Sequence, residues 1–587
     1  MDQILGSRDA FEELSDAFPI SSVIYVGILF IVGGLFLTRW FTKRSLERYS
    51  NLPTVLWRPR FANYVHGKMM NVGSSITNIL PKMKRMGEKK YGMFGTVYGV
   101  STKVVHIAHP VPAHLVLGTS PITHAHQDGV VNRKQFKNER GFQLGALKRP
   151  AYNHFFNFSG QGVFTSDGED WHRKRSSVIH SLFRGSQGSS FSDRIELEAN
   201  LAADNFINEV KHKNRNDRVD ELAEIDIVPI LQRSTIGMIY RYITKDDFLQ
   251  PLSLNDNSKA IEESSDLNEY LDAVTKIRMI ILAQARSIWF LLPRWIYTYF
   301  SSMYRQEERI MDPIRKFARQ ACDRAKPGSP LDALRKRVSH MDKSLPNQNS
   351  ISKNMLDETI TLLFAGQDTS AATLSWTLHL LSLYPDCQRK LYNEVADVFN
   401  DSSCEEKKDA DMKPNDYLCR SSLSRLKYLD AVIKESMRLY PVAPFVVRSL
   451  PHDIRVPESD IILSKGSFAC VWIYGLHRNN HFWHRPNSFI PERWLEENLQ
   501  RKDKGQKNGS YMPFAAGPRS CLGQSIGNIV LRTMLARIIH KFFVSDSRLK
   551  SEDDVLNLHK DMQAGFTVLP SGGLNLALQS RYSDVII

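Results

Sequence analysis

The chain has 587 residues, of which 42% are hydrophobic and 10% aromatic, which is ample for a large buried core. Its formal net charge is +14, but no basic repeat with interleaved aromatic residues and no zinc-finger spacing accompanies this charge, so nucleic-acid binding is not predicted. An anionic lipid surface or an acidic partner protein matches the positive charge better, and the alternative is a charge spread over a solvated surface.

The N-terminus divides into three segments. Residues 1–16 are acidic, and residues 17–38 contain no charged residue and are long enough to cross a bilayer as a helix, for which about 20 residues are needed. Residues 39–60 are basic at first and then form a linker with two prolines. We predict a retained transmembrane anchor rather than a cleaved signal peptide, with the remaining chain in the cytoplasm. Residues 61–587 show no linker-like break and are predicted to form one domain.

Three regions are predicted to form strands. Residues 96–117 are rich in β-branched side chains and predict a strand pair. Residues 444–449 and 461–472 have a similar composition. Residues 562–578 predict a final hairpin that turns around Pro570.

Trp171 and Arg175 open a short predicted helix, in which their spacing places both side chains on one face. Taken alone, such a pair is more typical of a cation–π contact at the protein surface. Further along the chain, residues 280–300 are unusually apolar, but Pro293 interrupts them. We therefore expect a core helix there and not a second membrane span.

A long helix is predicted from residue 353 to residue 384, because Pro385 stops the helical pattern. Near its centre, Gly366 costs helix stability and the hydroxyl of Thr369 can bond to the helix backbone. We expect a local distortion there, with a groove of the size of dioxygen. A later helix, residues 423–440, carries Glu435 and Arg438 one turn apart, a spacing that by itself indicates a weak surface ion pair.

The segment from Tyr511 to Gly523 presents a single cysteine on a glycine-bearing loop, directly before an apolar run with helical spacing. The positive end of that helix favours a thiolate at Cys521. A lone thiolate without neighbouring Cys or His residues indicates haem iron more than zinc. Gly517 and Gly523 would let the backbone pass close to a flat cofactor, and Arg519 is placed to reach an anionic group on it. The alternative is that Cys521 is a small buried hydrophobic residue.

The pattern Phe514-x-x-Gly517-x-Arg519-x-Cys521-x-Gly523 closely resembles the haem-binding loop of the cytochromes P450, the haem-thiolate monooxygenases. The other motifs follow in the order of this family, and the resemblance covers roughly residues 50–580. It implies a mainly α-helical fold with small β-sheets, here behind one N-terminal transmembrane helix. It also implies a haem b with an axial thiolate from Cys521.

The resemblance also implies roles for residues outside the cysteine loop. Trp171, Arg175 and Arg448 match positions that bind the haem propionates. Asp368 and Thr369 match an acid and an alcohol that manage proton delivery during oxygen activation.

Other matched residues have supporting roles in the family. Glu435, Arg438 and Arg493 match a buried charged set that supports the haem loop, and residues 280–300 match a lid region that often rests on the membrane. Some fatty-acid hydroxylases of the family carry, where Ala365 stands here, a glutamate that forms an ester with the haem. Because Ala365 has no carboxylate, a non-covalent haem is implied.

The implied reaction inserts one atom of dioxygen into a lipophilic substrate, such as a lipid, fatty acid, sterol or isoprenoid. Because the chain has no flavin or nicotinamide motif, the implied electron donor is a separate NADPH-dependent flavoprotein reductase, with a small b-type cytochrome as a second candidate. The implied location is the endoplasmic reticulum membrane, with a single pass and a cytoplasmic catalytic domain. Two alternatives stay open: a haem-thiolate isomerase or dehydratase, and a non-enzymatic membrane haem protein that binds a gas or a lipid.

Overall fold

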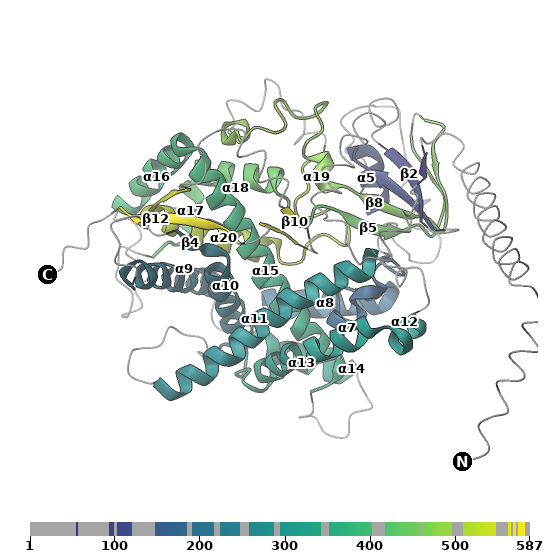
Figure 1. Ribbon diagram of the computed structural model, residues 1–587, viewed down its shortest axis with the longest axis horizontal. Helices are drawn as coiled ribbons and strands as arrows, with labels where there is room; N and C mark the ends of the chain where they lie inside the picture. Colours follow the sequence, from purple (N-terminus) through teal and green to yellow (C-terminus); the bar gives the residue numbers. More distant parts are fainter. Residues whose placement is uncertain are drawn as a thin grey trace, which may run out of the picture.

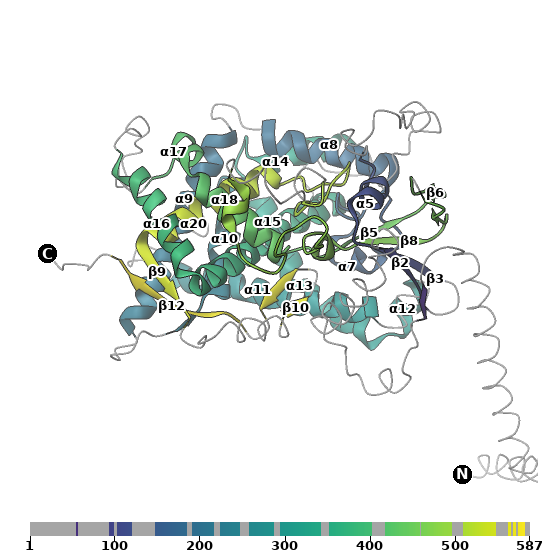
Figure 2. The same cartoon turned by 90° about the horizontal axis from the view of Figure 1, so that it is seen from above.

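A computed structural model describes residues 54–56, 93–98, 102–119, 147–184, 191–216, 224–246, 257–286, 294–341, 351–401, 417–457, 459–495, 509–546, 562–564, 567–570 and 573–581. Helices fill the middle of the molecule, with one sheet at one end and a second sheet at the opposite end (Figures 1 and 2). The predicted mainly α-helical fold with small sheets is therefore confirmed.

The helices account for most of the described chain. Their bounds are α5 Pro110–Leu117, η1 Asn153–Phe155, α7 Phe156–Ser159, α8 Gly168–Arg184, α9 Phe191–Asn216, α10 Ile227–Thr244, α11 Asn257–Arg286, α12 Arg294–Phe300, α13 Ser302–Asp323, α14 Pro330–Met341, α15 Lys353–Leu383, α16 Pro385–Asn400, α17 Arg420–Arg425, α18 Lys427–Leu439, α19 Ile473–Leu476, η5 Pro491–Trp494 and α20 Gln524–Lys541.

The largest sheet has the strand order β1-β2-β3-β8-β5, in which β1–β2 and β3–β8 are parallel pairs and β2–β3 and β8–β5 are antiparallel pairs. A second sheet has the order β4-β12-β9, and β6–β7 and β10–β11 are two-stranded. The strands are β1 Thr54–Leu56, β2 Met93–Tyr98, β3 Thr102–Ile107, β4 Ile225–Asp226, β5 Val446–Ser449, β6 Ile454–Arg455, β7 Ile462–Leu463, β8 Phe468–Val471, β9 Phe542–Ser545, β10 Met562–Ala564, β11 Val568–Pro570 and β12 Asn575–Ser580.

The second half of the predicted strand pair at residues 96–117 is a helix, so that part of the prediction is wrong. Residues 93–98 and 102–107 do form the antiparallel pair β2–β3, but α5 follows shortly after β3. Pro110 at the helix start has the backbone angle that a first turn needs, and the side chain of His109 accepts a hydrogen bond from the N–H of Val111 at 3.3 Å. The proline and the His109 cap at the helix start therefore favour a helix here more strongly than the β-branched residues favour a strand.

The predicted final hairpin forms, but its turn lies earlier than expected. In β10–β11, Ala564 pairs with Val568 and Met562 pairs with Pro570, so the chain turns before Val568 and not around Pro570. The following strand, β12, pairs with β9 and β4 instead.

Helix α15 crosses the centre of the molecule and packs against α10, α13, α18 and α20 (Figures 1 and 2). Its observed bounds agree with the predicted helix at residues 353–384, and the hydroxyl of Ser352 caps its first turn by accepting from the N–H of Met355. Gly366 has a packing role that the sequence did not reveal. A Cβ atom at this position would lie 2.6 Å from a side-chain carbon of Ile239 on α10, so glycine permits the close approach of the two helices.

Glu435 is the centre of a buried charged cluster. Its carboxylate accepts hydrogen bonds from Arg438 at 2.8 and 2.9 Å, from Arg493 at 3.0 Å and from the indole N–H of Trp494 at 2.9 Å. Burial by itself would raise the pKa of Glu435, but the two guanidinium groups hold it below its usual value. The ring of Trp494 lies 4.5 Å from that of Tyr511, where the cysteine loop begins. The three charged residues are therefore buried together beside this loop, as the family resemblance implies, and do not form the surface ion pair that the spacing alone indicates.

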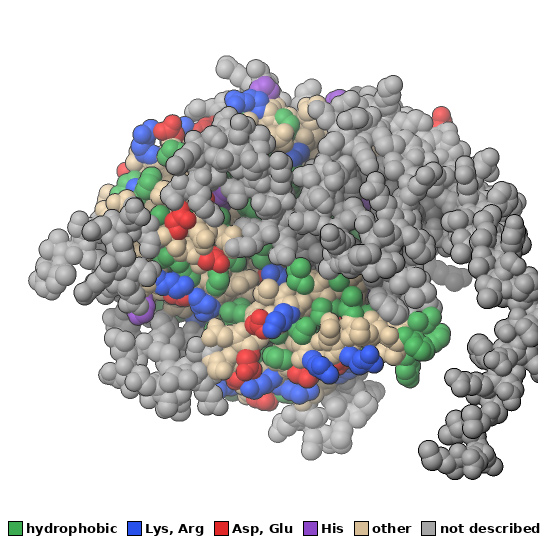
Figure 3. All heavy atoms as spheres, in the orientation of Figure 1, with side chains coloured by type: hydrophobic (Ala, Val, Ile, Leu, Met, Phe, Trp, Pro, Cys, Tyr) green, Lys and Arg blue, Asp and Glu red, His purple; other side chains and the backbone are tan. Residues whose placement is uncertain are grey.

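Helix α12 presents aromatic side chains to solvent while one tyrosine holds it in place. Trp295, Tyr299 and Phe300 are 61%, 77% and 71% exposed, and hydrophobic side chains gather at this end of the molecule (Figure 3). The buried hydroxyl of Tyr297 donates to Glu307 of α13 at 2.9 Å and accepts from Gln284 of α11 at 2.5 Å. The predicted core helix at residues 280–300 is thus only partly buried where it is described.

None of the helices in the described ranges is both long and apolar enough to cross a membrane. The predicted anchor at residues 17–38 lies outside those ranges, as do the acidic segment before it and most of the linker after it.

We expect Glu435→Ala to lower the free energy of unfolding by about 3–5 kcal/mol, because it leaves two buried guanidinium groups without their shared carboxylate. Urea unfolding followed by tryptophan fluorescence measures this loss. Asp386→Ala, which removes a solvent-exposed ion pair with Arg389, is the matched control and should change stability little. Equal losses in the two variants would show that the buried cluster has no special energetic role.

Candidate functional site

The loop that carries Cys521 is held by its own backbone and by α5. The N–H of Cys521 donates to the carbonyl of Phe514 at 2.9 Å, and that of Ser520 donates to Gly517 at 3.0 Å. Gly517 has φ +77°, and a Cβ atom there would collide with the carbonyl oxygen of Leu117 at the end of α5. Glycine is therefore required at this position by backbone angle and by space.

Cys521 lies directly before α20, and solvent reaches its side chain although protein surrounds it on the other sides. Burial raises the pKa of its thiol, while the N–H of Gly523 and the charge of Arg175 act in the opposite direction. The N–H at the helix start therefore favours the thiolate as predicted, but burial outweighs this contribution in the protein alone. A bound metal cation would deprotonate such a thiol.

Phe514 and Gly523 flank the cysteine in different ways. Phe514 is partly buried, and its ring lies 3.9 Å from the position of a Cβ atom at Gly527, in the first turn of α20. A Cβ atom at Gly523 would meet no atom within 4 Å among the described residues. Open space next to Gly523 is consistent with room for a flat group beside the loop.

The side chains of Trp171, Arg175, Arg448 and Arg519 converge next to this loop from α8, β5 and the loop itself. The Arg519 guanidinium stacks 4.0 Å from the Trp171 ring and forms an ion pair with Asp167 at 2.5 Å. Arg175 donates to the carbonyl of Ser520 at 3.1 Å, one residue before Cys521. The structure thus brings the predicted propionate-binding residues together with the cysteine loop.

Lys148 and Asp167 complete this cluster, and the sequence analysis did not find them. The ammonium of Lys148 donates to the carbonyl of Phe164 at 2.9 Å, and the carboxylate of Asp167 accepts from the backbone N–H groups of Lys148 and Arg149. Both lie in stretches without a motif, so no sequence signal was available.

The electrostatics of the cluster favour an anionic ligand. Burial lowers the pKa of Arg519 to about 9, and it also lowers the pKa values of Arg448 and Arg175. The pKa of Lys148 falls well below its usual value through burial and through the charges of the nearby arginines, against which Asp167 acts. Positive charge is therefore concentrated in a low-dielectric site. The two propionates of haem b fit this donor set.

Thr369 lies on an open side of α15. Ala365 and Thr369, one turn apart, are exposed on a helix whose other central residues are largely buried, and the hydroxyl of Thr369 donates to the carbonyl of Ala365 at 2.7 Å. Residues 353–383 form one uninterrupted α-helix, so the local distortion that we expected near Gly366 is not seen, and the groove stays a prediction.

Asp368 points away from this stripe. It is fully buried and forms an ion pair with Arg278 of α11 at 2.6 Å, while the hydroxyl of Thr567 donates to its second oxygen at 2.5 Å. Arg278 and Thr567 are further site residues that the sequence analysis missed, because each lies far from Asp368 along the chain.

Comparisons with known proteins identify the family. The profile described as cytochrome P450 matches residues 59–573. Cytochrome P450 4V2 of Rattus norvegicus is 28% identical, with 72% of this chain and 75% of that protein covered. Cytochrome P450 4V2 of Homo sapiens is 26% identical, with 74% and 77% covered, and cytochrome P450 4c3 of Drosophila melanogaster is 23% identical, with 70% and 72% covered. The chain therefore belongs to the cytochrome P450 family, and it is a haem-thiolate monooxygenase that uses haem b.

Proposed function

We propose that Cys521 is the axial thiolate ligand of the haem and that Phe514, Gly517 and Gly523 shape the loop around it. The observation that carries this proposal is the concentration of buried cationic side chains directly beside Cys521, which lies on a loop before α20. Arg448 and Arg519 are almost fully buried there, and an anionic cofactor offsets their cost of desolvation.

In this proposal, some residues bind the propionates and others hold those residues in position. Trp171 supplies a flat surface that orients the Arg519 guanidinium, and Asp167 fixes its position by an ion pair. Arg175 bridges to the carbonyl of Ser520 and so connects α8 to the cysteine loop. Each of these contacts prepares a donor before the cofactor binds.

We propose that Thr369 and Asp368 would handle protons during the dioxygen chemistry that a bound haem supplies. When bound, the haem iron supplies the chemistry of dioxygen activation, to which the thiolate contributes electron density. The hydroxyl of Thr369 is held by the carbonyl of Ala365, on an exposed side of α15. Asp368 is held by Arg278 and Thr567, so this carboxylate must exchange a partner before it can pass a proton at Oδ1 or Oδ2.

The electron donor that we propose is an NADPH-dependent flavoprotein reductase, with a small b-type cytochrome as an additional donor. Arg173 is exposed on α8, two residues after Trp171, and offers positive charge on the helix that contacts the cysteine loop. Its position supports docking of an acidic donor at this face.

We propose that residues 17–38 anchor the chain in the endoplasmic reticulum membrane, behind an acidic segment at 1–16 and before a basic linker at 39–60. Residues 61–587 form the catalytic domain on the cytoplasmic side. The exposed aromatic residues of α12 support a second contact with the lipid surface. A substrate that enters from this surface is lipophilic, such as a lipid, fatty acid, sterol or isoprenoid.

Cys521→Ser should abolish the strongly red-shifted band of the reduced, carbon monoxide-bound protein, because that band requires a thiolate ligand. Cys387→Ser, at a free and partly buried cysteine of α16, is the matched control and should retain the band. Retention of the band in Cys521→Ser would assign the ligand to another residue.

Thr369→Ala should slow substrate oxidation by about 10²-fold, the lower range for loss of a positioned proton donor. NADPH consumption should continue, and hydrogen peroxide should appear in place of product. The measurement is peroxide released per NADPH consumed with the reductase present. Thr373→Ala removes a hydroxyl one turn along the same helix and should leave this ratio unchanged. Full coupling in Thr369→Ala would remove this residue from proton delivery, and turnover without a reductase would favour an isomerase or dehydratase.

Replacing Trp295, Tyr299 and Phe300 with serine should weaken binding to lipid vesicles by about tenfold or more in a chain that begins at residue 39, because large apolar surfaces no longer enter the interface. Vesicle co-sedimentation measures the partition coefficient. Ile462→Ser, at another exposed apolar side chain in β7, is the control. Equal partitioning of all variants would exclude α12 as a membrane contact.

A further inference from the structure

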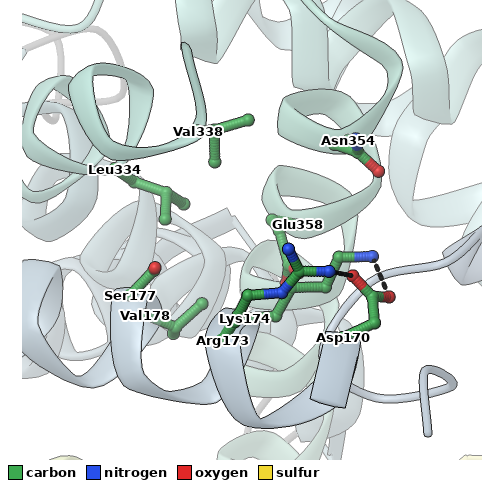
Figure 4. Close-up of a pocket in the computed structure, with 9 residues that line it drawn as sticks. All are labelled: Asp170, Arg173, Lys174, Ser177, Val178, Leu334, Val338, Asn354 and Glu358. Carbon is green, nitrogen blue, oxygen red and sulfur yellow. Dashed lines mark hydrogen bonds and ion pairs between the residues drawn. The ribbon is translucent and has the colours of Figure 1, made fainter. Parts of the chain in front are cut away.

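A pocket with a cavity volume of about 180 Å³ lies between α8, α14 and the first turns of α15, outside the cysteine site (Figure 4). Val178, Leu334 and Val338 form its apolar side, and Glu358 of α15 forms part of its polar side. The volume is several times the roughly 30 Å³ that one water molecule occupies in the liquid, so an organic molecule has room here.

Glu358 provides the second observation, because one of its oxygens is buried without a partner. Its side chain is only 1% exposed, and Oε2 accepts from the N–H of Val163 at 3.0 Å. Oε1 has no hydrogen-bond partner among the described residues. Burial raises the pKa of Glu358 to about 7. A buried acceptor without a donor is unfavourable, and it is satisfied if a ligand in the pocket supplies the donor.

The charges that surround the pocket are balanced, which narrows the class of ligand. The ammonium of Lys174 is bonded to Asp170 at 2.7 Å and to the carbonyl of Gln161 at 2.5 Å, and Arg173 lies 3.8 Å from the same Asp170. Two acidic side chains, Asp170 and Glu358, and two basic ones, Arg173 and Lys174, line the pocket, so the lining favours neither an anion nor a cation. Within the described part of the chain, no group of three or more His, Cys, Asp or Glu residues is arranged to hold a metal ion.

We propose that this pocket binds a small neutral molecule that carries a hydroxyl group on a compact apolar body. The hydroxyl bonds to Oε1 of Glu358, and the apolar body packs against Val178, Leu334 and Val338. A hydroxyl group suits this position because it donates to a carboxylate and accepts from a carboxylic acid, so it fits both protonation states of Glu358. Water alone satisfies Oε1 but gains nothing from the apolar wall.

The pocket is connected to the cysteine site through the same carboxylate. Oε2 of Glu358 holds the N–H of Val163, and the carbonyl of Val163 accepts from Arg519 at 3.2 Å. A ligand on Oε1 would therefore bind to the same carboxylate as the N–H of Val163, and the carbonyl of Val163 in turn contacts Arg519. The binding site itself does not rest on the proposed roles of Cys521 or Thr369.

The first test uses the full chain in lipid nanodiscs, with ¹³C-labelled valine and leucine methyl groups, and cyclohexanol as the probe. We expect saturable shifts of the methyl signals of Val178, Leu334 and Val338. Cyclohexanecarboxylate, which has the same ring but a negative charge, should not produce them. The absence of saturable shifts, or equal shifts with the carboxylate, would overturn the proposal.

Two pairs of variants separate the ligand contact from general damage to the fold. Glu358→Leu should weaken cyclohexanol binding by about tenfold, the factor that corresponds to one hydrogen bond, whereas Glu358→Gln keeps polar atoms at the site and should bind normally. Val338→Trp should fill the pocket and abolish binding, while Ile179→Trp adds the same bulk on α8 outside the pocket. If Glu358→Leu does not fold, the tryptophan pair decides, and equal binding in Val338→Trp and Ile179→Trp contradicts the proposal.

Discussion

Buried positive charge beside the cysteine loop is the constraint on which the site depends. Lys148, Arg448 and Arg519 come from three distant segments, and each loses hydration where they meet. Asp167 offsets part of this cost and also fixes the backbone that carries Lys148. In the arrangement that we propose, the propionates of the haem offset the remaining cost. The cofactor would then stabilise this arrangement of elements as a counter-ion, in addition to being the reactive centre.

The same logic explains the position of the second charged cluster. Glu435 gathers Arg438 and Arg493 behind the start of the cysteine loop, where the rings of Trp494 and Tyr511 are in contact. The cluster beside the cysteine has one carboxylate, Asp167, for several cationic side chains, whereas the Glu435 cluster has its buried hydrogen bonds satisfied within the protein. The cysteine loop thus lies between two charged clusters. The Glu435 cluster is fully paired within the protein, and the Arg519 cluster has cationic groups in excess.

Sequence patterns correctly predicted the features that depend on interactions between residues close together in the chain. The spacing around Cys521 and the long apolar run of α15 gave the family and the central helix, because loop glycines, capping and helical periodicity act over a few residues. The fold elements that were wrong depended on competing signals: prolines converted residues 110–117 into a helix, and the last hairpin turns before Val568. Arg278, Thr567, Lys148 and Asp167 could not be found, since only the folded chain brings them to their partners. The thiol of Cys521 could not be judged either, because its pKa depends on burial.

The ion pair between Asp368 and Arg278 joins the centre of the molecule to its periphery. Arg278 belongs to α11, and the same helix carries Gln284, which bonds to Tyr297 of α12. Helix α12 bears the exposed aromatic residues, so one helix, α11, connects that outer surface with the acid next to Thr369. A displacement of α11 along its axis would lengthen the contact between Arg278 and Asp368. The outer surface and the buried acid are therefore linked through a continuous set of contacts.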